Sequence, residues 1–345
     1  MSLGRKIFSV VGLLFVGFVA MTLWTSRALF SGPHEVPPFS ILPADVALTF
    51  ATTPRGSMLV QRADAGDLVG VALDGDPLEV YRTIGYAGLR DLAARPEDLR
   101  VAVDELTIPT RLAEVHVAVG TNFRAHAQEV LLDGDPFLFP KISIPTAWNA
   151  PVAMTARLDY EAELCAVLLE PYTGENPPAL GFLLCNDYTD RWELLRWIDL
   201  DGSMGITGFA DAKGGFSRLP VGPLLVIPED PEAFYPTVTL SLGVNGKLRQ
   251  QESAGLMIWS PREVVRQALE SCGTNYQLGG GDYKWPPCEQ FDAGTLVLTG
   301  TPRGVIFKPL NLWLGSLYLK PGDEITVSSP GLGLLRNKVE LQYVN

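Results

Sequence analysis

Short apolar runs, separated by breaks rich in glycine and proline, constrain the fold of this chain more than any other feature. The 345 residues include 34 Gly and 27 Pro, which favour turns and end helices early. The runs have the length and composition of β-strands. They cover residues 46–51, 57–61, 68–73, 111–119, 164–169, 180–185, 224–227, 237–244, 295–298, 324–328 and 339–344. Many strands with few helices predict a mixed α/β fold that is mainly β, a roll or barrel rather than a doubly wound sheet.

Local signals place a hairpin and two helices among these strands. Asn245-Gly246 lies between two runs and is typical of a tight β-hairpin turn. Residues 261–271 read as a helix, because Ser260 is a good N-cap and Pro261 suits the first helical turn. Residues 86–94 read as a second, short helix.

Composition excludes some classes of protein. Hydrophobic residues make up 47% of the chain, which is too many for a disordered protein. The formal net charge is -12, and no basic stripe is present. We therefore expect no nucleic-acid partner.

The N-terminus carries an apolar segment, residues 7–24, preceded by Arg5 and Lys6. Its length is close to the roughly 20 residues that a membrane-spanning helix needs. We predict a single membrane anchor with the body of the protein extracytoplasmic, since basic residues favour the inner side. A cleaved signal followed by secretion and a helix buried in the domain are the alternatives. The expected domains are residues 1–32 (anchor or signal), 33–110 (linker and N-terminal lobe) and 111–345 (catalytic domain).

The four cysteines form no Cys-x-x-Cys pair, so a zinc or redox site is not expected. Cys272 and Cys288 flank a loop rich in Gly and Pro, where they either form a disulfide or remain two separate thiols. Cys165 and Cys185 lie in apolar runs and are interpreted as small core residues.

Two glutamates, Glu161 and Glu163, stand two residues apart beside an apolar run. Side chains two apart on a strand point to the same face, and two adjacent carboxylates repel unless a cation or a proton separates them. A third carboxylate, Asp187, follows the next apolar run. Either these are solvated groups, or they form a site of hard oxygen ligands for Mg²⁺ or Mn²⁺, with Ca²⁺ also possible.

Several segments around these carboxylates resemble the catalytic domain of the fumarylacetoacetate hydrolase superfamily. They occur in the family's order across residues 112–343. The matching segments are GTNFRAHAQE (120–129), PFLFPK (136–141), DYEAEL (159–164), CNDYTDR (185–191), GFADAKGGF (208–216), GKLRQQ (246–251), LVLTGTPRGV (296–305), LKPGDEI (319–325) and PGLGLLRN (330–337). The resemblance implies the family's mixed β-sandwich roll, a pseudo-barrel, and a homodimer.

The resemblance also implies a metal centre. Glu161, Glu163 and Asp187 would be the ligands of the metal. Lys213 would lie beside it and help to hold the substrate oxygens, where a positive charge stabilises a developing enolate.

The remaining roles concern the substrate. The resemblance implies that His126 and Glu129 form a dyad on a helical turn that closes as a lid, and that Thr301 contacts the substrate carboxylate or a metal-bound water. Residues three apart share one helical face, so Glu129 is able to orient His126 as a base. Lys141, Arg249 and Gln250 are weaker candidates for substrate contacts.

The expected activity is metal-dependent hydrolysis of a C–C bond in an acylpyruvate or fumarylpyruvate-like β-dicarbonyl acid. The first alternative uses the same enolate, either for decarboxylation of a 2-oxo acid or for isomerisation of an unsaturated 2-hydroxy diacid. The second is a non-catalytic, membrane-anchored binding protein. Because His126 and Glu129 are both present, we favour water activation and hydrolysis.

Three features depart from the family pattern. Asp190 and Trp192 replace smaller residues after the Asn-Asp pair, and the stretches 273–287 and 307–319 are additions. We expect these additions to form either dimer contacts or the rim of a pocket.

Overall fold

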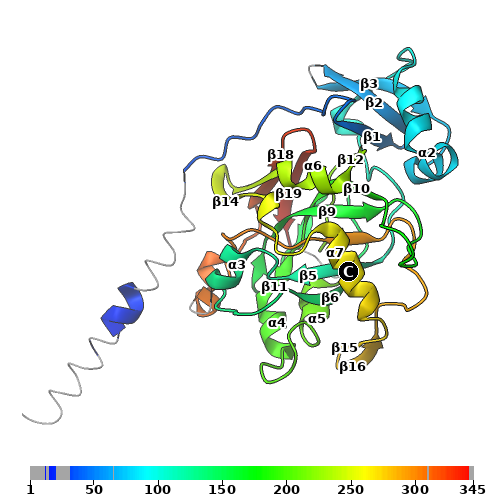
Figure 1. Cartoon of the computed structure of the whole chain (residues 1–345). Helices are drawn as coiled ribbons and strands as arrows, with labels where there is room; N and C mark the ends of the chain where they lie inside the picture. Colours follow the sequence, from blue (N-terminus) through cyan, green and yellow to red (C-terminus); the bar gives the residue numbers. More distant parts are fainter. Residues whose placement is uncertain (1–11, 13–14, 21–31, 65, 309–310, 342–345) are drawn as a thin grey trace, which may run out of the picture.

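The computed structural model describes residues 12, 15–20, 32–64, 66–308 and 311–341. Its core is one large mixed sheet and one smaller sheet with few helices (Figure 1), so the prediction of a mixed, mainly β fold is confirmed. In spatial order the large sheet consists of β4 (Leu99–Ala102), β3 (Asp67–Leu73), β2 (Gly56–Asp64), β1 (Ala47–Thr53), β12 (Leu224–Pro228), β10 (Leu180–Asn186), β9 (Ala162–Leu168), β17 (Leu296–Leu298), β5 (Val115–Gly120) and β6 (Phe137–Ile142).

The smaller sheet packs against the centre of the large one. Its β13, β18 and β19 lie against β9 and β10 and cover one face of these two strands. Every residue of β9 and β10 is buried, which explains why both strands read as continuous apolar runs. In spatial order this sheet consists of β14 (Lys247–Ser253), β13 (Thr239–Val244), β18 (Glu324–Ser329), β19 (Gly333–Glu340) and β7 (Val152–Ala153).

Short helices and two strand pairs surround the sheets. The helices are α2 (Pro77–Ala93), α3 (Arg124–Glu129), α4 (Arg191–Trp197), α5 (Phe209–Lys213), α6 (Pro231–Phe234) and α7 (Pro261–Glu270). The single-turn 3-10 helices are Val103–Glu105, Tyr235–Thr237, Ala254–Leu256, Asn311–Trp313 and Gly315–Leu317. The separate pairs are β8 (Leu158–Asp159) with β11 (Thr189–Asp190), and β15 (Asn275–Leu278) with β16 (Gly281–Lys284).

Local chemistry explains which predicted elements are confirmed. Asn245 and Gly246 both have positive φ, 51° and 72°, and join β13 to β14 in the predicted hairpin. The hydroxyl of Ser260 accepts a hydrogen bond from the Glu263 amide at 3.2 Å and caps α7 as predicted. The predicted helix 86–94 is the second half of α2, which kinks at Gly85.

One strand prediction was displaced. The last strand was expected over residues 339–344, whereas β19 spans Gly333–Glu340, and residues 342–344 lie outside the described residues. Arg336 and Lys338 alternate with buried residues along β19, because only one face of this strand packs on the core. The alternation hides the strand from a search for continuous apolar runs.

Residues 33–110 join the same sheet as the rest of the chain. Strand β1 pairs antiparallel with β12, so β1 to β4 extend the large sheet, and α2 lies beside them at the top right of Figure 1. A separate N-terminal lobe with the boundaries given above stays a prediction.

The prediction of a membrane anchor over residues 7–24 is contradicted by the structure. In the described part of the chain no helix combines the length and the apolar character that crossing a membrane requires. Residues 12 and 15–20 are helical, and the rest of the segment lies outside the described residues. The extracytoplasmic location was deduced from that anchor and is therefore not supported.

The structure contains two disulfides. Cys272 and Cys288 close the loop that carries β15 and β16, which was one of the two alternatives. Cys165 and Cys185 are core residues, as interpreted, and they also form a disulfide that was not predicted. The register explains the bond. Cys165 pairs with Leu183 and Cys185 with Glu163, which makes the two cysteines diagonal neighbours on β9 and β10.

Candidate metal centre and substrate cavity

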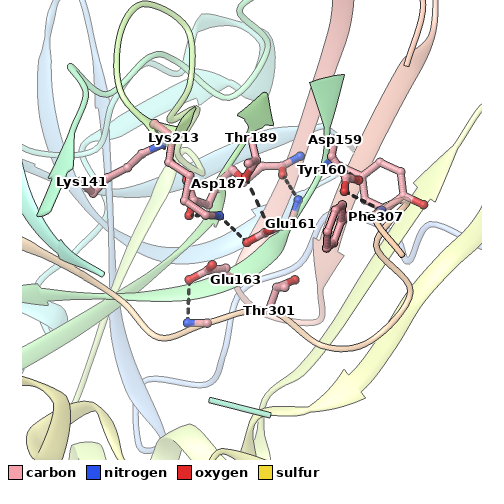
Figure 2. A network of polar contacts seen from close by, with 12 residues as sticks. Lys141, Asp159, Tyr160, Glu161, Glu163, Asp187, Thr189, Lys213, Thr301 and Phe307 are labelled. Atoms are coloured by element: carbon pink, nitrogen blue, oxygen red, sulfur yellow. Dashed lines mark hydrogen bonds and ion pairs between the residues drawn. The ribbon is translucent and has the colours of Figure 1, made fainter. Parts of the chain in front are cut away.

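The three predicted metal ligands converge where β9 and β10 meet. The carboxylates of Glu161, Glu163 and Asp187 are buried and offer oxygen atoms that all lie within 4.8 Å of one another (Figure 2). Glu163 lies in β9, while Glu161 and Asp187 lie just outside the paired ends of β9 and β10. The amide of Asp187 donates to the carbonyl of Glu161 at 2.9 Å, so the strand pairing itself brings the three together.

Basic side chains neutralise two of the three carboxylates. The Lys213 ammonium lies 2.6 Å from Glu161 Oε2 and 2.7 Å from Asp187 Oδ2. Lys141 Nζ lies 2.6 Å from the other oxygen of Asp187. Among the described residues Glu163 has no basic partner, and its Oε2 accepts a hydrogen bond from the Gly300 amide at 2.8 Å.

Burial and neighbouring charges shift the pKa values of the two glutamates in opposite directions. Burial alone would raise the pKa of Glu161, but the charges of Lys213 and Arg191 outweigh it and lower the pKa to about 2. For Glu163, burial raises the pKa well above its usual range, and the negative charges of Asp187 and Glu161 raise it further. The triad therefore lacks positive charge at Glu163.

This donor set fits a hard divalent cation. Three clustered carboxylates with neither His nor Cys among them suit Mg²⁺, Mn²⁺ or Ca²⁺, and a cation would supply the charge that Glu163 lacks. The triad is thus compatible with a metal, without selecting one ion over another.

The predicted dyad lies on α3, as expected. His126 Nδ1 is 3.6 Å from Glu129 Oε2, slightly beyond hydrogen-bond length. Glu129 is held by the Gly304 amide at 2.8 Å and by Lys308 at 3.3 Å. Burial would raise the pKa of Glu129, but His126, the Gly304 amide and Lys308 together lower it, so the group is a carboxylate able to orient an imidazole.

Thr301 lies between the triad and the five-stranded sheet. Its hydroxyl donates to the carbonyl of Ala162 at 3.0 Å and accepts from Gln250 Nε2 at 2.9 Å. Gln250 Oε1 in turn accepts the Ala162 amide at 3.0 Å. Gln250 is buried and positions Thr301, whereas Thr301 itself lines the cavity described below.

The two other weaker candidates lie away from the cavity. Lys141 is fully buried and holds Asp187 and the carbonyls of Lys213 and Arg218. Burial lowers the pKa of Lys141 to about 8, against the opposing charge of Asp187. Arg249 lines a different, smaller cavity of about 170 Å³. Substrate contacts by Lys141 and Arg249 stay predictions.

A cavity of about 390 Å³ opens beside the triad. Its polar lining comprises Thr121, His126, Glu161, Arg191, Lys213 and Thr301. The remainder of the lining is apolar and comes mainly from α4, from β6 and from the residues that follow α3. The structure therefore brings Glu161, Lys213, His126 and Thr301 to one cavity.

Sequence reasoning missed a buried ion pair behind the triad. Arg191 Nε lies 2.9 Å from Asp159 Oδ2, and the same guanidinium also contacts Glu161. Asp159 accepts the amides of Ile306 and Phe307, each at 2.9 Å (Figure 2). The Arg of the CNDYTDR segment was the available signal, although its partner lies 32 residues away.

The structure also shows where the residues that depart from the family pattern lie. Asp190 caps α4 by accepting the Trp192 amide at 2.9 Å, and the Trp192 ring packs edge-on against Trp313. In the added stretch 307–319, Phe307, Leu312 and Trp313 line the cavity, which favours a pocket rim over a dimer contact. Pro309 and Leu310 lie outside the described residues.

Comparison with known proteins points to one family. The model of the fumarylacetoacetate (FAA) hydrolase C-terminal domain matches residues 115–340. Oxaloacetate tautomerase YisK of Bacillus subtilis is 27% identical over 242 residues, which cover 65% of this chain and 68% of that protein. An uncharacterised protein of Methanocaldococcus jannaschii is 27% identical over 243 residues, covering 67% and 84%.

Two solved structures share the fold. A fumarylacetoacetate hydrolase from Exiguobacterium antarcticum superposes with a TM-score of 0.60 at 24% identity, covering 86% of this chain and 100% of that one. A probable 2-hydroxyhepta-2,4-diene-1,7-dioate isomerase from Mycobacterium abscessus gives a TM-score of 0.61 at 22% identity, covering 86% and 99%.

Proposed function

Because this chain belongs to the fumarylacetoacetate hydrolase family, we propose that it is a metal-dependent enzyme that hydrolyses a C–C bond in a β-dicarbonyl 2-oxo acid. The buried triad of Glu161, Glu163 and Asp187 carries the proposal, because Glu161 lines a cavity together with His126 and Lys213. A divalent cation bound by the triad would supply Lewis-acid stabilisation of an enolate.

A positively charged side chain of the protein would bind the 2-oxo acid group of the substrate. Lys213 lies within 2.7 Å of two triad carboxylates and lines the cavity, so its ammonium would face the oxygens of a 2-oxo acid. Burial lowers the pKa of Lys213, but Asp187 and Glu161 outweigh it and raise the pKa, which keeps the ammonium charged. Such a fixed positive charge stabilises negative charge that develops on the substrate.

His126 and Glu129 would carry out the proton transfer from water. Glu129 is held by Gly304 and Lys308, and His126 faces the cavity, so His126 would take a proton from water while Glu129 orients the ring. Water addition at the distal carbonyl would then break the C–C bond. The electron pair of that bond would pass to the 2-oxo acid fragment and be protonated there.

A tautomerase or isomerase is the second candidate. One relative is named an oxaloacetate tautomerase, and one solved structure of the same fold is described as an isomerase. Either reaction needs only proton transfer at the same enolate. The pair of His126 and Glu129, 3.6 Å apart, would move that proton. Decarboxylation of oxaloacetate stays a third expectation.

Metal-dependent turnover of the full chain tests the proposal. The protein is stripped with a chelator and assayed on acetylpyruvate and on enol-oxaloacetate, with and without Mg²⁺ or Mn²⁺. Acid products from acetylpyruvate that require metal support hydrolysis, whereas metal-dependent ketonisation of oxaloacetate without C–C cleavage supports the tautomerase.

Two variants separate the remaining outcomes. Glu163→Gln keeps the shape of the side chain and should abolish metal-dependent activity. His126→Gln should retain metal binding and lose hydrolysis. Wild-type protein that binds metal but turns over neither substrate would favour a binding protein, and wild-type protein that binds no metal would overturn the proposed site. A homodimer, implied by the resemblance, is checked by light scattering of the same sample.

A further inference from the structure

Outside its polar residues the cavity lining is apolar, and this part of the lining is the apolar end of the cavity. Helix α4 contributes Leu194 and Leu195, and its C-cap residue Ile198 also lines the cavity. The lining also includes an aromatic cluster, in which the ring centroids of Phe137 and Phe139 are 4.9 Å and 5.2 Å from that of Phe209. The Phe139 ring joins this cluster to the metal end, because its centroid is 5.7 Å from the Lys213 ammonium. Rings packed this closely form a rigid wall.

The cations of the cavity lining are already paired. Arg191 contacts both Asp159 and Glu161, and Lys213 contacts Glu161 and Asp187. Among the described lining residues these two and His126 are the basic groups, and all three lie near the triad. A second substrate carboxylate that ends inside the cavity, against its apolar lining, would thus lose its water without gaining a cation, which is costly.

The apolar end also reaches the surface. Leu200 and Trp313 both line the cavity, yet 74% and 67% of their areas are exposed. Leu195 beside them is 38% exposed. A chain bound in the cavity can therefore extend outward between apolar side chains instead of ending against a polar wall.

We propose that this site takes β-dicarbonyl acids whose distal end is an apolar acyl or aryl chain, not a second carboxylate. The proposal rests on the proposed function for the reacting head group. The apolar surface of the cavity would contact the distal chain and select the substrate by its length.

Paired substrate series test the selection. Acetylpyruvate, butanoylpyruvate, hexanoylpyruvate, octanoylpyruvate and benzoylpyruvate are compared with diacids of matched length, such as succinylpyruvate and adipoylpyruvate. Each added methylene is expected to raise kcat/KM by roughly fourfold, about 0.8 kcal/mol, until the chain leaves the cavity. Each diacid should be at least tenfold poorer than its apolar counterpart. Equal or better turnover of the diacids would overturn the proposal while leaving the reaction type standing.

A binding measurement separates this proposal from the activity. Calorimetry with 2-oxohexanoate, 2-oxooctanoate and the diacid 2-oxoadipate is done on metal-free protein and again with Mg²⁺. The dissociation constant should fall with chain length in both states, and 2-oxoadipate should bind more weakly than 2-oxohexanoate. This pattern in an inactive protein would support the apolar site and refute the proposed reaction. Chain-independent binding would refute the apolar site whatever the activity.

A cation placed in the apolar lining should reverse the preference. Leu195→Lys adds an ammonium to a partly exposed face of α4, where it is expected to fold. Leu341→Lys is the matched control, because Leu341 is 58% exposed and does not line the cavity. The ratio of 2-oxohexanoate to 2-oxoadipate affinity should fall at least tenfold in Leu195→Lys alone, with thermal melts of both variants checking the fold. An unchanged ratio in a folded Leu195→Lys protein would contradict the proposal.

Discussion

The two ends of the cavity are built in different ways. The metal end is made by two fully buried, paired strands, β9 and β10, whose register brings Glu161, Glu163 and Asp187 together. The apolar end is made by α4, by the residues that follow α3, and by Phe307, Leu312 and Trp313. Strands inside a sheet hold side chains rigidly, whereas loops and short helices vary at little cost. The comparison suggests that the reaction type depends on the sheet and the substrate choice on its surroundings.

The two ends are nevertheless connected. Asp159 pairs with Arg191 at the metal end and accepts the amides of Ile306 and Phe307 at the rim. Phe307 lines the cavity and lies under the Arg191 guanidinium at 5.2 Å from its ring centroid. A change at the rim can therefore shift Arg191, which contacts Glu161.

The largest effect should come from Glu163→Gln, which alters only the metal end. Loss of this ligand charge is expected to lower metal-dependent kcat/KM by at least about 10³-fold, as much as the loss of one strong oxyanion donor. Binding of 2-oxooctanoate to the metal-free protein should change little, because the apolar end is untouched. Calorimetry and steady-state kinetics measure both. Near-normal turnover would separate the triad from the reaction.

Next in size is His126→Gln, which removes the base between the two ends. General-base contributions are typically about 10²–10⁴-fold, so kcat should fall by that factor while the affinity for Mg²⁺ is retained. Glu129→Gln, which removes only the orienting carboxylate, should cost less. A fall in kcat equal to that of His126→Gln would show that the two act as one unit.

The two disulfides offer a matched test of location. Cys165–Cys185 spans 20 residues and lies within the strand pair that carries the triad, whereas Cys272–Cys288 spans 16 residues in an outer loop. Replacing either pair with Ala should cost about 2–4 kcal/mol of unfolding free energy, since the closed loops are of similar size. Only the Cys165 and Cys185 replacements should weaken Mg²⁺ binding. Urea unfolding and metal titration of both double variants would show whether location matters.

The last prediction concerns acidification and strand β5, which carries His116. Burial lowers the pKa of His116 to about 3, and the nearby charge of Lys141 adds to this. Between pH 6.5 and 3 the unfolded chain therefore binds a proton at His116 that the folded protein does not. Folding stability should fall on acidification through this window, by at most about 1.4 kcal/mol per pH unit.

His116→Gln checks that prediction. The Gln oxygen can replace His116 Nδ1 as the acceptor of the Leu296 amide, which lies 3.1 Å away. Urea unfolding at several pH values should show a shallower slope in the variant. An unchanged slope would assign the acid sensitivity to other groups.

Many strands of the large sheet could be predicted from the sequence, because a strand that is buried on both faces appears as a continuous apolar run. Strands β9, β10 and β12 are covered on both faces and are therefore continuous apolar runs. The prediction of the last strand was displaced because the pattern of β19 alternates. The anchor predicted over residues 7–24 was wrong, since no helix of the described residues could cross a membrane. The three carboxylates proposed as metal ligands were found because Glu161 and Glu163 stand two residues apart, because Asp187 follows the next apolar run, and because their segments resemble those of the family.

The sequence by itself determined the family, the mainly β fold and the identity of the carboxylates, since these depend on local spacing and on the order of motifs. Only the tertiary structure decided that Cys165 bonds Cys185, that Arg191 pairs with Asp159, and that residues from α4 and the stretch 307–313 share one apolar cavity. Those contacts join residues far apart in the chain. Their distances follow from strand register and sheet packing, which no local pattern encodes.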